Sequence, residues 1–133
     1  MPNIEITTNR TNGIRIWEPV HSDDAVTFAG AGTLLAGTIL ARDSVSLQLV
    51  PFVKGGTTDG NGVPVAVLDH ELVATGAGTL SIRPIVSGQI RSVQLVIDAD
   101  GDDSNVDAAV IDQLRDYSII ALFTDQLSEL DNQ

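Results

Sequence analysis

The chain has 133 residues, with 18 Asp and Glu against 7 Lys and Arg and no cysteine. This length predicts one domain with a core of its own, and the absence of thiols excludes disulfides, thiolate metal sites and a cysteine nucleophile. A net charge of −11 argues against binding to nucleic acid or to an anionic membrane, because both depend on clustered basic residues.

The ends and the long apolar stretches of the chain show no targeting or spanning segment. The start, MPNIEITTNR, lacks the basic region and the apolar run of a secretory signal. No apolar run approaches the ~20 residues needed to cross a bilayer. We therefore expect a soluble protein.

The composition favours strands over helices. Val, Ile, Leu and Thr are abundant, and twelve glycines punctuate them. This pattern is typical of a mainly β protein with many turns. The fold class we predict is α+β: a small β-rich domain, like a barrel or a sandwich, with one helix and an extended N-terminal arm.

The first thirty residues differ from the rest and form the predicted arm, residues 1–30. Two short alternating pieces flank a polar connection with an Asn-Gly turn. Two strands alone bury too little apolar surface to be stable in water, so this segment needs a partner to pair with. The apolar residues of the two pieces are Ile4, Ile6, Ile14 and Ile16.

Trp17 is the chain's only tryptophan and lies in the same arm. A core position is the ordinary interpretation of a tryptophan. An anchor at an interface is equally compatible with the sequence, since tryptophan is enriched at contact hot spots. The following HSDDAV reads as a loop.

Past residue 30 the chain alternates between apolar runs and turns. Gly-rich or polar segments separate the runs, among them RDS, KGGTTDGNG and SGQ. The runs predict strands around 38–41, in VSLQLVPFV, VPVAVL, TLSIRPIV and IRSVQLVI, and in a closing SIIALF.

Only NVDAAVIDQLRDY has a helical period. Its apolar stripe is flanked by Ala109 and Ile111 and consists of Val106, Val110, Leu114 and Tyr117. The domain is expected to span residues 31–124, and residues 125–133 form an acidic C-terminal tail.

The loop VIDADGDDSNVD invites comparison with a calcium site. An EF-hand loop that starts at Asp98 needs Gly at position 6 and Glu at position 12, and these positions hold Asp103 and Ala109. The preceding segment also reads as a strand rather than a helix. The EF-hand interpretation fails on these points.

Helix capping explains the same loop without a metal. Ser104 or Asn105 can be the N-cap, and Asp103 and Asp107 lie near the positive end of the helix dipole. A calcium-dependent β-rich binding module that uses the Asp98–Asp107 loop remains the alternative function. We expect no metal or other cofactor.

An enzyme is not expected. His70 stands between two acids in DHE, but neighbours on a strand point in different directions, so the triplet is no catalytic constellation by itself. A hydrolase based on His70 lacks a recognisable nucleophile and paired base. The Gly-rich KGGTTDGNG has no P-loop lysine and no helix after it.

One long stretch resembles a known family. The sequence SLQLVPFVKGGTTDGNGVPVAVLDHELVATGAGTLSIRPIVSGQI, followed by a helix and the strand in AVIDQLRDYSIIAL, resembles the lambda-type bacteriophage head decoration proteins, the protein D family. The resemblance covers about residues 32–122 and rests on the order of short motifs. The arm and the acidic tail after Phe123 differ from those of lambda's own protein.

The resemblance implies a structural role in a virion. It implies a homotrimer, made in the host cytoplasm, that binds the major capsid protein on the outer surface of an expanded phage head. The trimer sits at three-fold and pseudo-three-fold sites and stabilises the shell against internal DNA pressure. The arm then supplies the capsid-binding residues, which are Ile4, Ile6, Ile14, Ile16 and Trp17.

Overall fold

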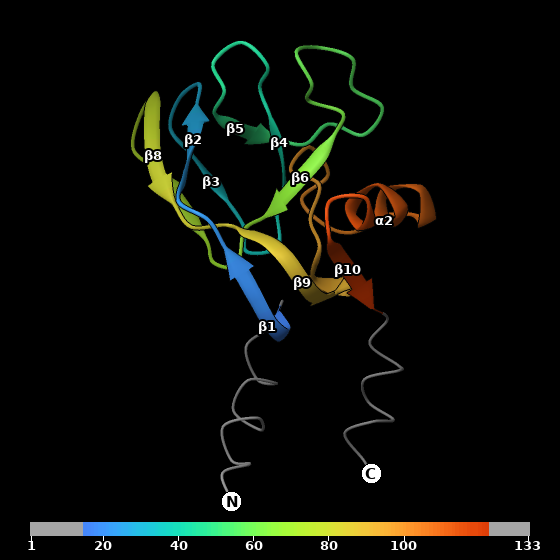
Figure 1. Ribbon diagram of the computed structural model, residues 1–133. Helices are drawn as coiled ribbons and strands as arrows, with labels where there is room; N and C mark the ends of the chain where they lie inside the picture. The colour runs from blue at the N-terminus through green and yellow to red at the C-terminus, as the bar shows by residue number, and fades with distance from the viewer. Residues whose placement is uncertain (1–14, 123–133) are drawn as a thin grey trace, which may run out of the picture.

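The computed structural model describes residues 15–122, so Ile4, Ile6, Ile14 and the acidic tail lie outside the described residues. Within that range the chain forms ten strands, one short 3-10 helix and one α-helix (Figure 1). In chain order these are β1 (Arg15–His21), β2 (Asp24–Phe28), β3 (Gly32–Leu34), β4 (Ile39–Arg42), β5 (Leu49–Pro51), β6 (Pro64–Val67), β7 (Leu72–Ala74), β8 (Gly78–Ile82), β9 (Ile85–Arg91), η1 (Ser92–Gln94), α2 (Ala108–Arg115) and β10 (Ile119–Leu122).

The described strands form two sheets. Eight strands build the larger one in the order β1-β9-β6-β4-β5-β2-β8, and β10 pairs in parallel with β9; β3 and β7 form the smaller sheet. The large sheet curls, so that β8 and β10 lie on opposite sides of the molecule (Figure 1). The predicted fold class, a small β-rich α+β domain, is confirmed.

Strand β4 is buried on both of its faces. Ile39 and Ala41 belong to a cluster of buried side chains shared with α2, β9 and β10, while Leu40 belongs to a second cluster shared with β2, β3 and β8. All three side chains are inaccessible to solvent. A strand covered on both faces carries a continuous apolar run instead of an alternating one, and this explains the sequence TILA.

Two long segments pair across both sheets. β2 pairs antiparallel with β8, where Phe28 is opposite Gly78, and β3 pairs antiparallel with β7, where Gly32 is opposite Ala74. The register therefore stays the same on both sides of an unpaired interruption at 29–31 and 75–77. We call these segments, residues 24–34 and 72–82, the bent ladder. Each interruption carries the same five residues, GAGTL, at 30–34 and 76–80.

Several predicted boundaries are wrong. The segment predicted as the loop HSDDAV contributes the end of β1 and the start of β2, because Asp24 and Val26 pair with β8. The predicted turn SGQ lies inside β9, where Gly88 accommodates a φ of 128°. The run IRSVQLVI is no strand, since β9 ends at Arg91 and η1 follows.

The predicted arm, residues 1–30, is partly built into the domain. β1 pairs with β9, and β2 pairs with β5 and β8. Val26 is fully buried in the second cluster. Residues 15–28 thus belong to the same sheet as the rest of the domain, and only residues 1–14 of the predicted arm lie before the first described strand.

The helix α2 covers one side of the curled sheet, as predicted, although it is shorter than its apolar stripe suggests. Val110 and Leu114 are buried against the sheet, while Tyr117 follows the helix and is 45% exposed. Between residues 15 and 122 no helix is long and apolar enough to cross a membrane.

Because Leu114 is fully buried, we expect its truncation to destabilise the fold. Leu114→Ala should lower the free energy of unfolding by ~2–5 kcal/mol, because it leaves a cavity under α2. The exposed neighbour Gln113 is the control, and Gln113→Ala should change it by less than ~0.5 kcal/mol. Urea denaturation of both variants measures the two losses. Losses of equal size would contradict the orientation of the helix.

An ion pair fastens the start of β2 to β4. The two guanidinium nitrogens of Arg42 donate to the two carboxylate oxygens of Asp24 at 2.8 and 2.6 Å. The side chain of Asp24 is only 14% exposed. The hydrogen bonds from Arg42 outweigh partial burial and lower the pKa of Asp24 below its ordinary value. This ion pair fixes the start of β2 relative to β4, although β5 lies between these two strands in the sheet.

The lowered pKa of Asp24 predicts a loss of stability in acid. The folded chain binds fewer protons at Asp24 than the unfolded chain, whose Asp pKa is about 3.9, so this stabilisation is present above that value and disappears as the pH falls through the folded pKa. Asp24→Asn should cost ~1–3 kcal/mol at pH 7. Its free energy of unfolding should also fall less between pH 5 and pH 2 than that of the unmodified chain. A parallel fall in both proteins would contradict the role of Asp24.

Candidate functional site

The predicted contact residues fall into two groups. Ile16 and Trp17 lie in β1, and Trp17 is opposite Gln89 of β9 in the register. The other three, Ile4, Ile6 and Ile14, lie outside the described residues. The structure therefore describes only β1, which holds the last two predicted contact residues and follows directly on the other three.

Strand β1 is an edge strand of irregular register. Among the described strands it pairs with β9 alone, and its register shifts between Arg15 and Trp17, between Trp17 and Val20, and between Val20 and His21. It also contains Pro19, which has no N–H to donate to a ladder and is found at sheet edges and bulges. An edge of this kind leaves main-chain groups available to another strand.

The two ends of the described chain meet at the same place. Arg15, the first residue of β1, is opposite Ile90, and Leu122, the last residue of β10, is opposite Arg91. Since Ile90 and Arg91 are adjacent on β9, both ends of the described chain lie side by side at one end of the sheet (Figure 1). We call β1, β9 and β10 the three-strand platform.

One face of this platform is exposed and partly apolar. Ile120 is opposite Gln89 across β9 and β10, and Val20 is opposite Ser87 across β1 and β9. Both aliphatic side chains are exposed, whereas Ile119 and Ile90, on the other face, are fully buried. The platform therefore combines a free strand edge, exposed aliphatic side chains and the two ends of the described chain.

A carboxylate between two histidines fastens the end of β1. The Nε2 of His21 lies 2.7 Å from one oxygen of Asp69, and the Nδ1 of His70 lies 2.8 Å from the other. Partial burial raises the pKa of Asp69, but the hydrogen bonds with His70 and His21 together bring it below its ordinary value. A backbone bond from Ser22 N to Pro84 O adds to the attachment.

The contacts of His70 do not resemble those of a catalytic histidine in a hydrolase. The His70 ring is largely exposed, and Asp69, which contacts it, also holds the ring of His21. The arrangement orients two histidines through one carboxylate and ties β1 to the segment after β6. It brings no serine or threonine hydroxyl to His70 in the hydrogen bonds of the described region.

The acidic loop is organised around the start of α2. Asp107 is the N-cap, and its carboxylate accepts from Val110 N at 3.1 Å and from the Nζ of Lys54 at 2.7 Å. The prediction of Ser104 or Asn105 as N-cap is wrong, because Ser104 N donates to Asp102 and Asn105 donates to Asp100. Three carboxylates of the Asp98–Asp107 loop thus accept hydrogen bonds from within the protein.

The same loop bears on the calcium alternative. In the part of the chain that the structure describes, no group of three or more His, Asp or Glu side chains is arranged to hold a metal ion. The hydrogen bonds from Lys54 and from Val110 N also lower the pKa of Asp107, so this carboxylate is charged as a helix cap. No observation in the described residues favours the calcium module.

Comparison with known protein families decides the identity. The model of the family described as bacteriophage lambda head decoration protein D matches residues 8–119. The chain belongs to this family. Searches of curated proteins and of solved structures gave no match.

Membership in the head decoration family makes the chain a structural protein of the phage capsid. The match reaches further toward the N-terminus than the motifs between residues 32 and 122 had indicated. Ile14, Ile16 and Trp17 lie inside the matched range, whereas Ile4 and Ile6 precede it. The part of the predicted contact segment next to β1 is therefore sequence that the family model shares.

Because Asp107 caps α2, we expect its removal to destabilise the fold. Asp107→Ala should lower the free energy of unfolding by ~0.5–2 kcal/mol, because it removes the acceptor for Val110 N. The exposed Asp103 is a matched control, and Asp103→Ala should stay within ~0.5 kcal/mol of the unmodified chain. Thermal denaturation without calcium measures both. A larger loss for Asp103→Ala would show that the cap is assigned to the wrong residue.

Proposed function

We propose that this head decoration protein is a cement protein that binds the outer surface of an expanded phage head and stabilises the shell against internal DNA pressure. It acts as a homotrimer at three-fold and pseudo-three-fold sites of the major capsid protein. The observation that supports this most is the family match over residues 8–119. The protein is made in the host cytoplasm, has no enzymatic activity and binds neither nucleic acid nor membrane.

The three-strand platform supports a particular mode of binding. Residues 1–14 enter the domain through β1, whose outer edge is free of other described strands. An arm that adds a strand to a capsid sheet gains main-chain hydrogen bonds, and alternate side chains supply specificity. The residues that we assign to this contact are Ile4, Ile6, Ile14, Ile16 and Trp17. The exposed Val20 and Ile120 lie on the platform itself, in β1 and β10.

The energetics favour several arms acting together. Fixing the backbone of an arm on the capsid costs ~1–2 kcal/mol per residue in entropy, so one arm alone binds modestly. A trimer presents three arms at once, and linked sites raise the overall affinity by ~10²–10⁴. Each trimer therefore holds several capsid subunits together, which is how a weakly binding arm stabilises a lattice.

Deletion of the arm tests this function. Removing residues 2–14 leaves β1 and its pairing with β9 intact, so the domain should remain folded and should no longer bind expanded heads. The two measurements are the occupancy on heads by electron microscopy and the thermal midpoint of the free protein. Full occupancy of the truncated chain would place the capsid contact elsewhere and contradict the proposal.

Trp17→Ala gives a sharper version of the same test. It should weaken binding to heads by ~30-fold or more, which corresponds to a hot-spot loss of ~2 kcal/mol. The thermal midpoint of the free protein should change little. Val93→Ala, a change of an exposed aliphatic residue in η1, is the control and should leave both quantities unchanged. A large drop in the midpoint with unchanged binding would show that Trp17 packs within the domain.

A further inference from the structure

The three-strand platform has an exposed face that the described elements leave largely uncovered. Val20 and Ile120 are 55% and 41% exposed there. They lie opposite Ser87 and Gln89, which are two residues apart on β9 and therefore belong to the same face of the sheet. The opposite face of β9 and β10 is packed into the cluster beneath α2. An aliphatic sheet face beside a free edge is a place where another segment can dock.

The chain leaves β10 next to this face (Figure 1). Ile120 lies two residues before Leu122, the last residue of β10, and residues 123–133 follow. From β10 to β1 the platform is about two inter-strand spacings wide, or roughly 10 Å. A segment as long as residues 123–133, which we call the C-terminal segment, measures about 16 Å as a helix. It is therefore long enough to reach from Leu122 to Val20.

The charges at this end of the molecule suit an acidic segment. The C-terminal segment contains three acids and no basic residue. The platform strands hold two arginines, Arg15 and Arg91, against one acid, Glu18, in a chain whose net charge is −11. Both arginines lie where β10 ends, because Arg91 is opposite Leu122 and Arg15 is paired one position away on β9. The acidic segment thus begins beside the basic end of the platform.

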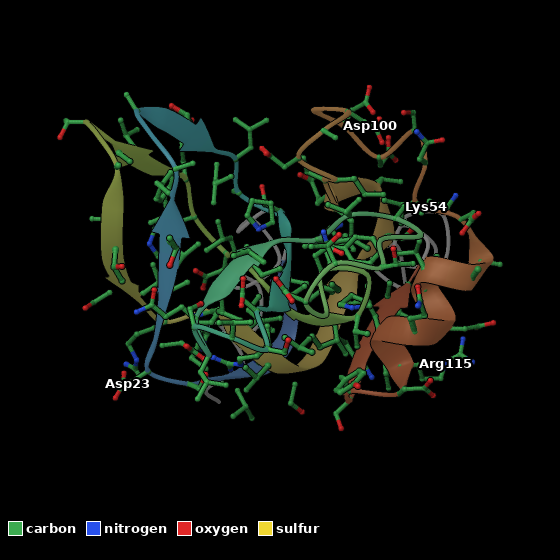
Figure 2. All side chains as sticks on the ribbon, turned by 90° about the horizontal axis from the view of Figure 1, so that it is seen from above. Asp23, Lys54, Asp100 and Arg115 are labelled. Carbon is green, nitrogen blue, oxygen red and sulfur yellow. The ribbon has the colours of Figure 1, made fainter. Side chains whose placement is uncertain are left out.

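The basic residues of the domain outside the platform form ion pairs with aspartates. They are Arg42, Lys54, Arg83 and Arg115. Figure 2 shows two of them, Lys54 and Arg115, on the α2 side of the molecule. The other arginines of the chain, Arg10, Arg15 and Arg91, lie in the arm or on the platform. Positive charge is therefore gathered at the end from which the C-terminal segment departs.

The sequence of the C-terminal segment matches the exposed face in a second way. Leu127 and Leu130 are three residues apart, which is the spacing of neighbours on one side of a helix. Thr124 and Asp125, just before them, are residue types that cap the start of a helix. An amphipathic segment of this kind binds by placing its apolar side chains against an aliphatic surface.

We propose that the C-terminal segment docks on the exposed face of the platform in the free protein and competes there with the phage head. Its two leucines cover Val20 and Ile120, and its acids lie toward the platform arginines. Because Leu122 tethers the segment beside its site, the effective concentration is about millimolar, and a weak contact is enough to hold it. The competition rests on the proposed function, since it regulates the same capsid-binding end of the domain, whereas the docking does not.

The chain carries one intrinsic reporter of this docking and accepts a single label. Trp17, its only tryptophan, and Ile120 lie opposite the same residue, Gln89, on the two sides of β9. Since the chain has no cysteine, Ser128→Cys lets one nitroxide be attached to the C-terminal segment of the full-length protein. Docking brings the nitroxide to the platform, so Trp17 fluorescence should be quenched and should recover when the nitroxide is reduced. Equal fluorescence before and after reduction would overturn the docking.

Variants of the labelled protein locate the contact. Leu127→Ser combined with Leu130→Ser removes the apolar side chains of the segment, and Ile120→Ser removes part of the aliphatic face. Each variant should restore most of the Trp17 fluorescence. Quenching that survives in the leucine variant would overturn the contact.

Two controls and one mixture complete this measurement. Gln126→Ser with Asn132→Ser changes polar residues of the segment, and Val45→Ser changes a 76% exposed residue between β4 and β5. Both controls should stay quenched, and fluorescence restored in them as well would contradict the assignment. A labelled Trp17→Phe chain, refolded together with unlabelled unmodified chain, should leave the fluorescence unquenched. Quenching in that mixture would place the segment on a neighbouring copy and overturn a contact within one chain.

Head binding tests the competition. The unlabelled Leu127→Ser, Leu130→Ser protein should bind expanded heads ~3–10-fold more tightly, because apparent affinity is scaled by the fraction of molecules whose site is uncovered. The Gln126→Ser, Asn132→Ser protein should bind like the unmodified chain. Unchanged binding of the leucine variant, with its quenching lost, would overturn the competition. If neither the unmodified chain nor the leucine variant binds heads while the quenching results stand, the proposed function fails and the docking holds.

Discussion

The rest of the structure depends on the burial of β4 on both of its faces. β4 separates two apolar clusters, one beneath α2 and one beneath the bent ladder, and its residues contribute alternately to each. Because β4 pairs with β5 on one side and β6 on the other, it fixes where both halves of the sheet lie.

The two halves of the molecule present surfaces of different character. On one side α2, the acidic loop and the ion pair of Lys54 with Asp107 make a charged exterior in which carboxylates cap and join elements. On the other side, residues 25–34 and 72–82 of the bent ladder contain no charged side chain. The three-strand platform lies at the end where the described chain begins and finishes.

The sequence predicts the fold class and the central strands well, and its errors have physical causes. Runs such as those at β4 and β6 were found because strands buried on two faces are continuously apolar. The run at residues 45–53 was predicted as one strand, but Leu47 turns instead, since Asp43 captures two backbone N–H groups and the chain bends there. The SGQ segment lies in a strand because neighbouring strands satisfy its backbone, which local turn propensity does not reveal.

The candidate site was only partly predictable. The alternation of isoleucines pointed to the arm, but a hydrophobic pattern alone did not show that β1 joins β9, since that pairing spans most of the chain. The bent ladder was missed, although two signals were present. The repeated GAGTL segments mark the two matching interruptions of the bent ladder, and the long stretches without charge in an acidic chain mark its exposed side.

Because Arg15 and Leu122 lie close together, the two ends of the described domain can be joined by a short linker. Both residues flank β9 at neighbouring positions, so the distance between them is about two inter-strand spacings, or roughly 10 Å. A linker of a few flexible residues spans that distance. The described domain can therefore be circularly permuted, with new termini at the exposed Lys54–Gly55, in the loop between β5 and β6. Its topology is set by the pairing of strands around β4 and not by the place at which the chain begins.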